Sequence, residues 1–173
     1  MTSSNSEYII NDPCFVDKTD VIKKVLFSLV NVSTPKSSKD YAWSIIKTLL
    51  TELREKYDFL KYIEIDELDY LKNTIDDIKI KQGMNRVAPR QIGKAIQDII
   101  DIFKTRMGTK AGYHFISEFK ENLGEEYHTL IKKMGVDLRL IDLQNELVGM
   151  MKNTDYKIKE DSTGSNIAFL EKQ

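Results

Sequence analysis

Apolar residues recur at helical spacing along most of this 173-residue chain. The clearest stripe follows Pro89, where six apolar side chains share one helical face. They are Ile92, Ile96, Ile99, Ile100, Phe103 and Met107. Proline suits the first turn of a helix, because the N–H that it lacks would have no partner there. The pattern therefore predicts a long amphipathic helix from Pro89 at the centre of the fold.

Two earlier segments show the same periodicity. The stretch that starts at Thr19 predicts a helix whose buried face holds Ile22, Val25, Leu26 and Leu29. Its other side holds Lys23, Lys24 and Ser28. Ser38 can cap a second helix, predicted over residues 39–57, because a serine hydroxyl accepts a hydrogen bond from a first-turn N–H. The buried face of this helix holds Ala42, Ile45, Ile46, Leu49 and Leu53, with Trp43 beside it.

Three more helices are predicted after Gly108, where the long helix breaks. The first ends at Gly124 and carries Gly112, Phe115, Ile116, Phe119 and Leu123 on one face; the second ends at Gly135 and carries Tyr127, Leu130, Ile131 and Met134. Glycine just past a helix can adopt a positive φ without a side-chain clash. Asp137 can cap the third helix, in which Leu140, Leu143, Leu147 and Met151 lie in line, although residues 136–140 alone also fit the start of a strand.

Two regions alternate between apolar and polar residues in the manner of strands. Residues 59–81 predict short strands around a helical turn, and residues 155–170 predict a C-terminal hairpin. The predicted fold class is therefore mainly α, a bundle of five or six helices with minor β structure near residues 60–82 and 155–170. We expect residues 1–14 to be a flexible leader, residues 15–152 a single helical domain, and residues 153–173 a hairpin or tail.

The amino-acid composition excludes several classes of protein. The chain is 41% hydrophobic and 31% charged, with a net charge of −1, so any attraction to an anionic partner must come from a local patch. Cys14 is the only cysteine, which excludes an internal disulfide and a thiolate-rich metal site. The sequence shows neither a signal-peptide pattern nor an uninterrupted apolar run long enough to span a membrane. We expect a cytoplasmic protein without a membrane partner.

Candidate catalytic and metal-binding groups are few. Glu125 and His128 form an E-x-x-H pair, and His114 and Glu118 are one helical turn apart, but helical geometry directs both histidines away from the apolar faces of their helices. The chain contains no nucleophile elbow and neither of the common glycine-rich nucleotide loops. We therefore predict no catalytic residues, no metal site and no cofactor, and we expect a protein that is not an enzyme.

Residues 79–94, KIKQGMNRVAPRQIGK, contain five basic residues and no acidic one. The candidate anion- or partner-binding residues are Lys79, Lys81, Arg86, Arg90 and Lys94. They precede and enter the start of a predicted helix, where N–H groups and the helix dipole favour anions. The segment lacks aromatic residues that could stack on bases, and it follows a strongly acidic stretch, residues 57–78. The two blocks can therefore also pair with each other, within one chain or across a dimer interface.

The C-terminal part, residues 125–173, allows another interpretation, since a helix, a glycine turn, a helix and a hairpin follow the order of a winged helix. Its second helix, however, carries Asp137, Asp142 and Glu146 against Arg139 and Lys152, a poor match to a polyanionic groove. We predict a non-catalytic protein–protein interaction or regulatory (adaptor) protein, a homodimer or a subunit of an assembly. The alternative is a regulator that binds nucleic acid or phosphate through this part or through residues 79–94.

Overall fold

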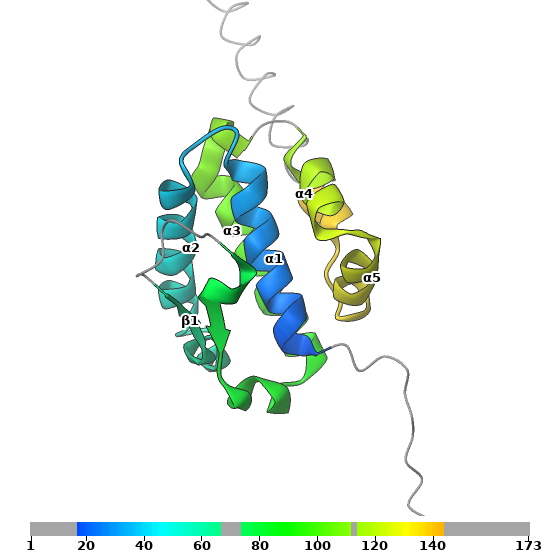
Figure 1. Cartoon of the computed structure of the whole chain (residues 1–173). Helices are drawn as coiled ribbons and strands as arrows, with labels where there is room; N and C mark the ends of the chain where they lie inside the picture. Colours follow the sequence, from blue (N-terminus) through cyan, green and yellow to red (C-terminus); the bar gives the residue numbers. More distant parts are fainter. Residues whose placement is uncertain (1–16, 67–73, 112–113, 144–173) are drawn as a thin grey trace, which may run out of the picture.

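The computed structural model describes residues 17–66, 74–111 and 114–143, and these residues form a mainly helical bundle (Figure 1). Its helices are α1 (Lys18–Ser33), α2 (Lys39–Leu53), α3 (Pro89–Met107), α4 (Phe115–Leu123) and α5 (Glu125–Lys133), followed by a helical segment at residues 138–143. A small sheet completes the fold, so the predicted class is confirmed. The predicted leader, Cys14 and the predicted C-terminal hairpin lie outside the described residues.

The sheet consists of β1 (Ile63–Ile65) and β2 (Ile78–Ile80), which pair antiparallel with Ile63 opposite Ile80. Ile63 and Ile78 are buried, while Glu64 and Lys79 point to solvent, as the alternating sequence requires. Short 3₁₀ helices flank the strands at η1 (Asp58–Tyr62), η2 (Ile75–Asp77) and η3 (Gln82–Arg86). The prediction of short strands near residues 60–82 is thus confirmed.

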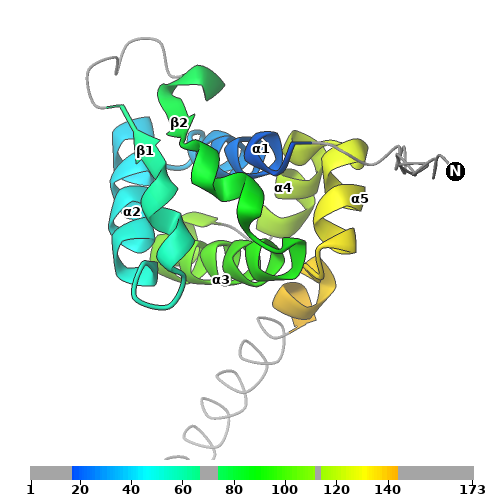
Figure 2. The same ribbon diagram turned by 90° about the horizontal axis from the view of Figure 1, so that it is seen from below.

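Helix α1 lies between α2 and the pair α4 and α5 in Figure 1, and α3 crosses the bundle behind it, as the turned view in Figure 2 shows. The sequence analysis assigned the central place to α3, and this needs correction, because α1 packs against each of the other four α-helices. A helix surrounded in this way must bury residues on more than one face. Ser28, predicted to lie on the polar side of α1, is accordingly buried together with Val21, Val30 and Val32.

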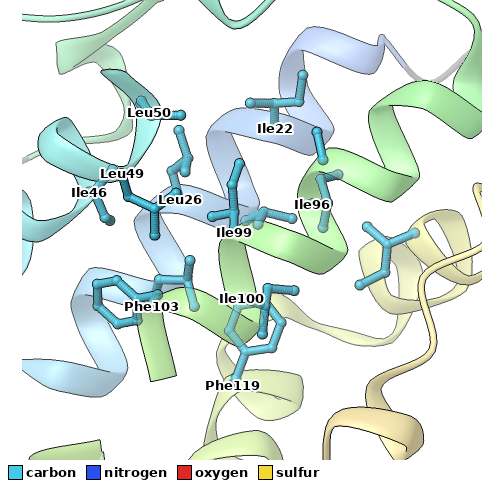
Figure 3. Close-up of a cluster of buried hydrophobic side chains, with 14 of the residues drawn as sticks. Ile22, Leu26, Ile46, Leu49, Leu50, Ile96, Ile99, Ile100, Phe103 and Phe119 are labelled. Carbon is cyan, nitrogen blue, oxygen red and sulfur yellow. The ribbon is translucent and has the colours of Figure 1, made fainter. Parts of the chain in front are cut away.

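The apolar stripe of α3 is confirmed in full, since all six residues predicted to be buried are less than 4% exposed. Figure 3 shows how this stripe meets α1 and α2: Ile96 and Ile99 approach Ile22 and Leu26, with Leu49 beside them. Burying an aliphatic side chain of this size contributes about 1.5–3 kcal/mol before the loss of chain entropy. This apolar contact therefore holds α3 in place.

The ends of several helices follow the sequence signals. Ser38 Oγ accepts a hydrogen bond from Tyr41 N–H at 3.2 Å, and Pro89 occupies the first turn of α3. Gly135, after α5, has a φ of +94°, which suits glycine because it has no Cβ. Two bounds differ from the predictions. Helix α2 ends at Leu53, and α4 begins only at Phe115, because residues 108–111 form the 3₁₀ helix η4 (Gly108–Ala111).

Gly93 allows α3 to approach the end of α5 very closely. A Cβ atom at this position would lie 2.0 Å from the carbonyl oxygen of Met134, a distance that no side chain tolerates. Gln97, one turn further along α3, donates to the backbone oxygen of Asp137 and accepts from its N–H, at 3.3 and 2.9 Å. These contacts fix the turn after α5 against α3.

Within the described residues, no helix combines the length and the apolar character needed to cross a membrane.

Candidate functional site

The structure divides the five basic residues of segment 79–94 into two groups. Lys79 and Lys81 lie on and just after β2, next to the acidic residues of β1. Lys79 Nζ lies 2.6 Å from Asp66 Oδ2, and Lys81 Nζ lies 2.6 Å from Glu64 Oε1. The strand register places each of these pairs on diagonal positions of the hairpin. The hydrogen bond from Lys79 to Asp66 raises the pKa of this lysine above its ordinary value of 10.5.

These two ion pairs connect the acidic stretch, residues 57–78, with the basic segment, residues 79–94, within one chain. All four side chains are largely exposed, so each pair is worth only a few tenths of a kcal/mol up to about 1 kcal/mol. Lys79 and Lys81 therefore already have anionic partners in the structure.

The second group, Arg86, Arg90 and Lys94, is exposed around the start of α3. None of these three side chains forms a hydrogen bond or ion pair with another described residue. Ala88, at the N-cap of α3, has no side-chain acceptor, and the first turn carries no acidic residue. Lys18 of α1 lies beside this region and donates to the backbone oxygens of Asn85 and Val87, at 3.1 and 2.8 Å. The uncompensated positive charge of the segment is thus confined to residues 86–94.

The last helical segment, residues 138–143, exposes apolar side chains. Asp137 caps it, because Asp137 Oδ1 accepts from the N–H groups of Arg139 and Leu140 at 2.9 and 3.3 Å. The segment buries Leu138 and Ile141, whereas Leu140 and Leu143 are 49% and 55% exposed. The strand alternative for residues 136–140 is therefore wrong. Of the row Leu140, Leu143, Leu147 and Met151, the two described members, Leu140 and Leu143, face solvent.

The two histidines occupy different environments. His114 is exposed immediately before α4, and His128 is half-buried on α5. Among residues 17–66, 74–111 and 114–143, no three His, Cys, Asp or Glu side chains converge in a way that could hold a metal ion.

His128 contributes to a feature that the sequence analysis did not identify, a surface pocket of about 400 Å³. The pocket lies where α4 and α5 meet the turn before the last helical segment, and its polar lining comprises Lys120, His128, Lys132, Asp137 and Arg139. The one sequence signal was the spacing of His128 and Lys132, which places them on the same face of a helix. The other members come from separate elements.

The winged-helix interpretation depends on a hairpin outside the described residues, so it stays a prediction. Comparison of the chain with protein-family models, with curated proteins and with solved structures gave no match. The function must therefore be argued from the chemistry of the surface.

Proposed function

We propose that this protein is a non-catalytic interaction protein that pairs with a second copy of itself through Leu140 and Leu143. The observation that carries the proposal is the exposure of these two leucines, 49% and 55%, on a segment whose opposite face is buried in the core. Together with Tyr41, they are the large apolar side chains that stand out as exposed in the part of the chain that the structure describes. An apolar row on an anchored helix is typical of an interface.

The sequence continues this row beyond the described residues. Leu140, Leu143, Leu147 and Met151 are spaced by three, four and four residues, the spacing that keeps apolar side chains on one face of a helix. A second copy carries the identical row, and a two-fold axis can bring the same surface of two chains together. The net charge of −1 leaves little electrostatic repulsion between copies. These features support self-association over a partner of different chemistry.

The test measures the mass of the full chain in solution by gel filtration with light scattering over a range of concentrations. We expect the wild type to reach twice the mass of one chain and the Leu140→Glu/Leu143→Glu variant to remain a monomer. Because both leucines are exposed, the variant should keep the circular dichroism spectrum of the wild type. Thr129→Glu, on the exposed surface of α5, is the matched control and should still dimerise. A wild type that stays monomeric at every concentration would refute the proposal.

A second candidate function, a regulator that binds nucleic acid or phosphate, is favoured by the cluster Arg86, Arg90 and Lys94, whose side chains have no partner among the described residues. Binding through these residues should weaken steeply as salt rises, because each phosphate contact releases counterions. Fluorescence anisotropy with labelled single-stranded and duplex DNA and RNA measures this. Arg86→Glu/Arg90→Glu should abolish the binding, while Lys79→Glu, at a position that already has a partner, should change it less. A flat salt response would exclude this candidate.

A further inference from the structure

The pocket between α4, α5 and the turn before residue 138 gathers positive charge. Lys120, Lys132 and Arg139 contribute three cations, and the half-buried His128 adds an imidazole. The single carboxylate of the lining, Asp137, is engaged as a helix cap by the N–H groups of Arg139 and Leu140. Like charges that converge in this way raise the free energy of the site unless an anion lies among them.

Elsewhere in the described residues, many cations have a carboxylate close by. Lys36 lies 2.8 Å from Glu118, and Lys56 lies 2.6 Å from Asp98. By contrast, the side chains of Lys120, Lys132 and Arg139 form no hydrogen bond or ion pair with any described residue. Their donors are therefore available to a ligand.

One wall of the pocket is held rigidly by backbone contacts. The N–H of Val136 donates to Ile131 O at 3.0 Å, and the N–H of Gly135 donates to Lys132 O at 3.0 Å. The side chain of Gln97 forms hydrogen bonds with both the N–H and the carbonyl oxygen of Asp137, and Gly93 packs against Met134. A site fixed before binding loses less entropy when it binds a ligand.

We propose that this pocket binds the phosphate group of a small phosphate ester. Guanidinium and ammonium groups are common donors to phosphate in proteins, and an imidazole N–H adds another. The volume of about 400 Å³ falls within the range of about 300–1,000 Å³ that is usual for small-molecule pockets, and it exceeds the space that a phosphate alone needs. The site is separate from residues 86–94 and goes beyond the proposed self-association.

The experiment titrates the isotope-labelled full chain with ribose 5-phosphate and follows the backbone amides by NMR. We expect saturable shifts centred on Gly135, Val136 and Leu138, no shift with ribose, and weaker binding of inorganic phosphate. Lys132→Gln/Arg139→Gln removes two charge-assisted hydrogen bonds and should weaken the binding of ribose 5-phosphate about tenfold or more. Both positions are exposed, so the variant should retain the wild-type fold, which its amide spectrum checks directly.

Two controls make the result specific. Lys133→Gln removes a neighbouring charge on α5 that does not line the pocket, and Arg86→Gln/Arg90→Gln removes charge from the basic segment. Both should bind ribose 5-phosphate within about twofold of the wild type. Equal weakening in the pocket variant and in these controls would overturn the proposal, as would the absence of saturable shifts. Inorganic phosphate that binds as tightly as the ester would overturn the ester assignment. The light-scattering measurement of mass tests self-association independently of phosphate binding.

Discussion

Ser28 and Ser33 are both buried on α1, but their hydroxyls differ in hydrogen bonding. Ser33 Oγ donates to Leu29 O at 2.7 Å, whereas Ser28 Oγ is enclosed without a hydrogen-bond partner among the described residues. A buried hydroxyl that forms no hydrogen bond loses its interaction with water and gains nothing in return, at a cost of about 1–3 kcal/mol. Two serines of one helix therefore allow a direct comparison.

We predict that Ser28→Ala raises the free energy of unfolding by about 1 kcal/mol, because it removes the unsatisfied hydroxyl and improves helix propensity. Ser33→Ala removes a hydroxyl that is already satisfied and should leave the free energy of unfolding unchanged or lower it by up to about 1 kcal/mol. Urea unfolding of both variants measures the difference. A Ser28→Ala variant that is less stable than Ser33→Ala would contradict the prediction, because it would show that the Ser28 hydroxyl stabilises the fold.

Asp17, the N-cap of α1, should make the free energy of unfolding depend on pH. Hydrogen bonds from the Thr19 hydroxyl and N–H lower the pKa of Asp17 below its ordinary value of 3.8. The charged form is thus favoured in the folded state, so its contribution is fully present above pH 3.8 and is lost as the pH falls through the lowered folded-state pKa. We predict that Asp17→Ala costs about 0.5–2 kcal/mol at neutral pH and less in acid.

Unfolding measured from pH 7 downwards tests this prediction. Asp17→Asn is the control, because asparagine keeps an acceptor for the N–H of Thr19 but does not titrate. The stability difference between Asp17→Asn and Asp17→Ala should therefore stay constant with pH. A cost of Asp17→Ala that is the same at every pH would contradict the role of the charge.

At the scale of elements, the β hairpin forms ion pairs between acidic side chains at β1 and basic side chains at β2. Glu64 and Lys81 are exposed and lie on diagonal positions, so we predict a coupling of about 0.2–1 kcal/mol between them. Lys81→Glu places two carboxylates together and should destabilise the fold, and Glu64→Lys in the same chain should restore most of the loss. A double-mutant cycle by urea unfolding measures the coupling. Additive effects would show that the pair contributes nothing to stability.

The local signals in the sequence predicted the elements well where the chemistry is local. Ser38 and Asp137 accept from first-turn N–H groups, and Pro89 starts its helix, because caps depend on residues only two or three positions apart. The last helical segment shows the limit of this reasoning. It buries Leu138 and Ile141 and exposes Leu140, and the spacing of its apolar residues did not specify which of them would be buried.

At the scale of the whole molecule, α1 packs against α2 and α3 as well as against α4 and α5, so it joins both sides of the bundle. We predict that Leu26→Ala, at a fully buried position of α1, lowers the free energy of unfolding by about 2–5 kcal/mol. Leu53→Ala, at the C-terminal end of α2 where the side chain is 8% exposed, should cost less because the site can relax.

Urea unfolding followed by Trp43 fluorescence and by circular dichroism checks this prediction. Trp43 reports on α2, whereas circular dichroism reports on all helices, so the two transitions should coincide if α1 couples both sides. Separate midpoints for the two probes would contradict the central role of α1.

Within the described residues, the sequence by itself determined most of the helices and the two short strands, where several helices begin or end, and which face of α3 is buried. These properties follow from neighbours along the chain and from the period of the apolar residues. Only the tertiary structure decided that α1 is central and that Lys120, Lys132 and Arg139 share a pocket. It also decided that Lys79 and Lys81 have ionic partners, whereas the side chains of Arg86 and Arg90 have none among the described residues. Each of these depends on contacts between residues from different elements, and the local pattern along the chain does not specify how those elements pack.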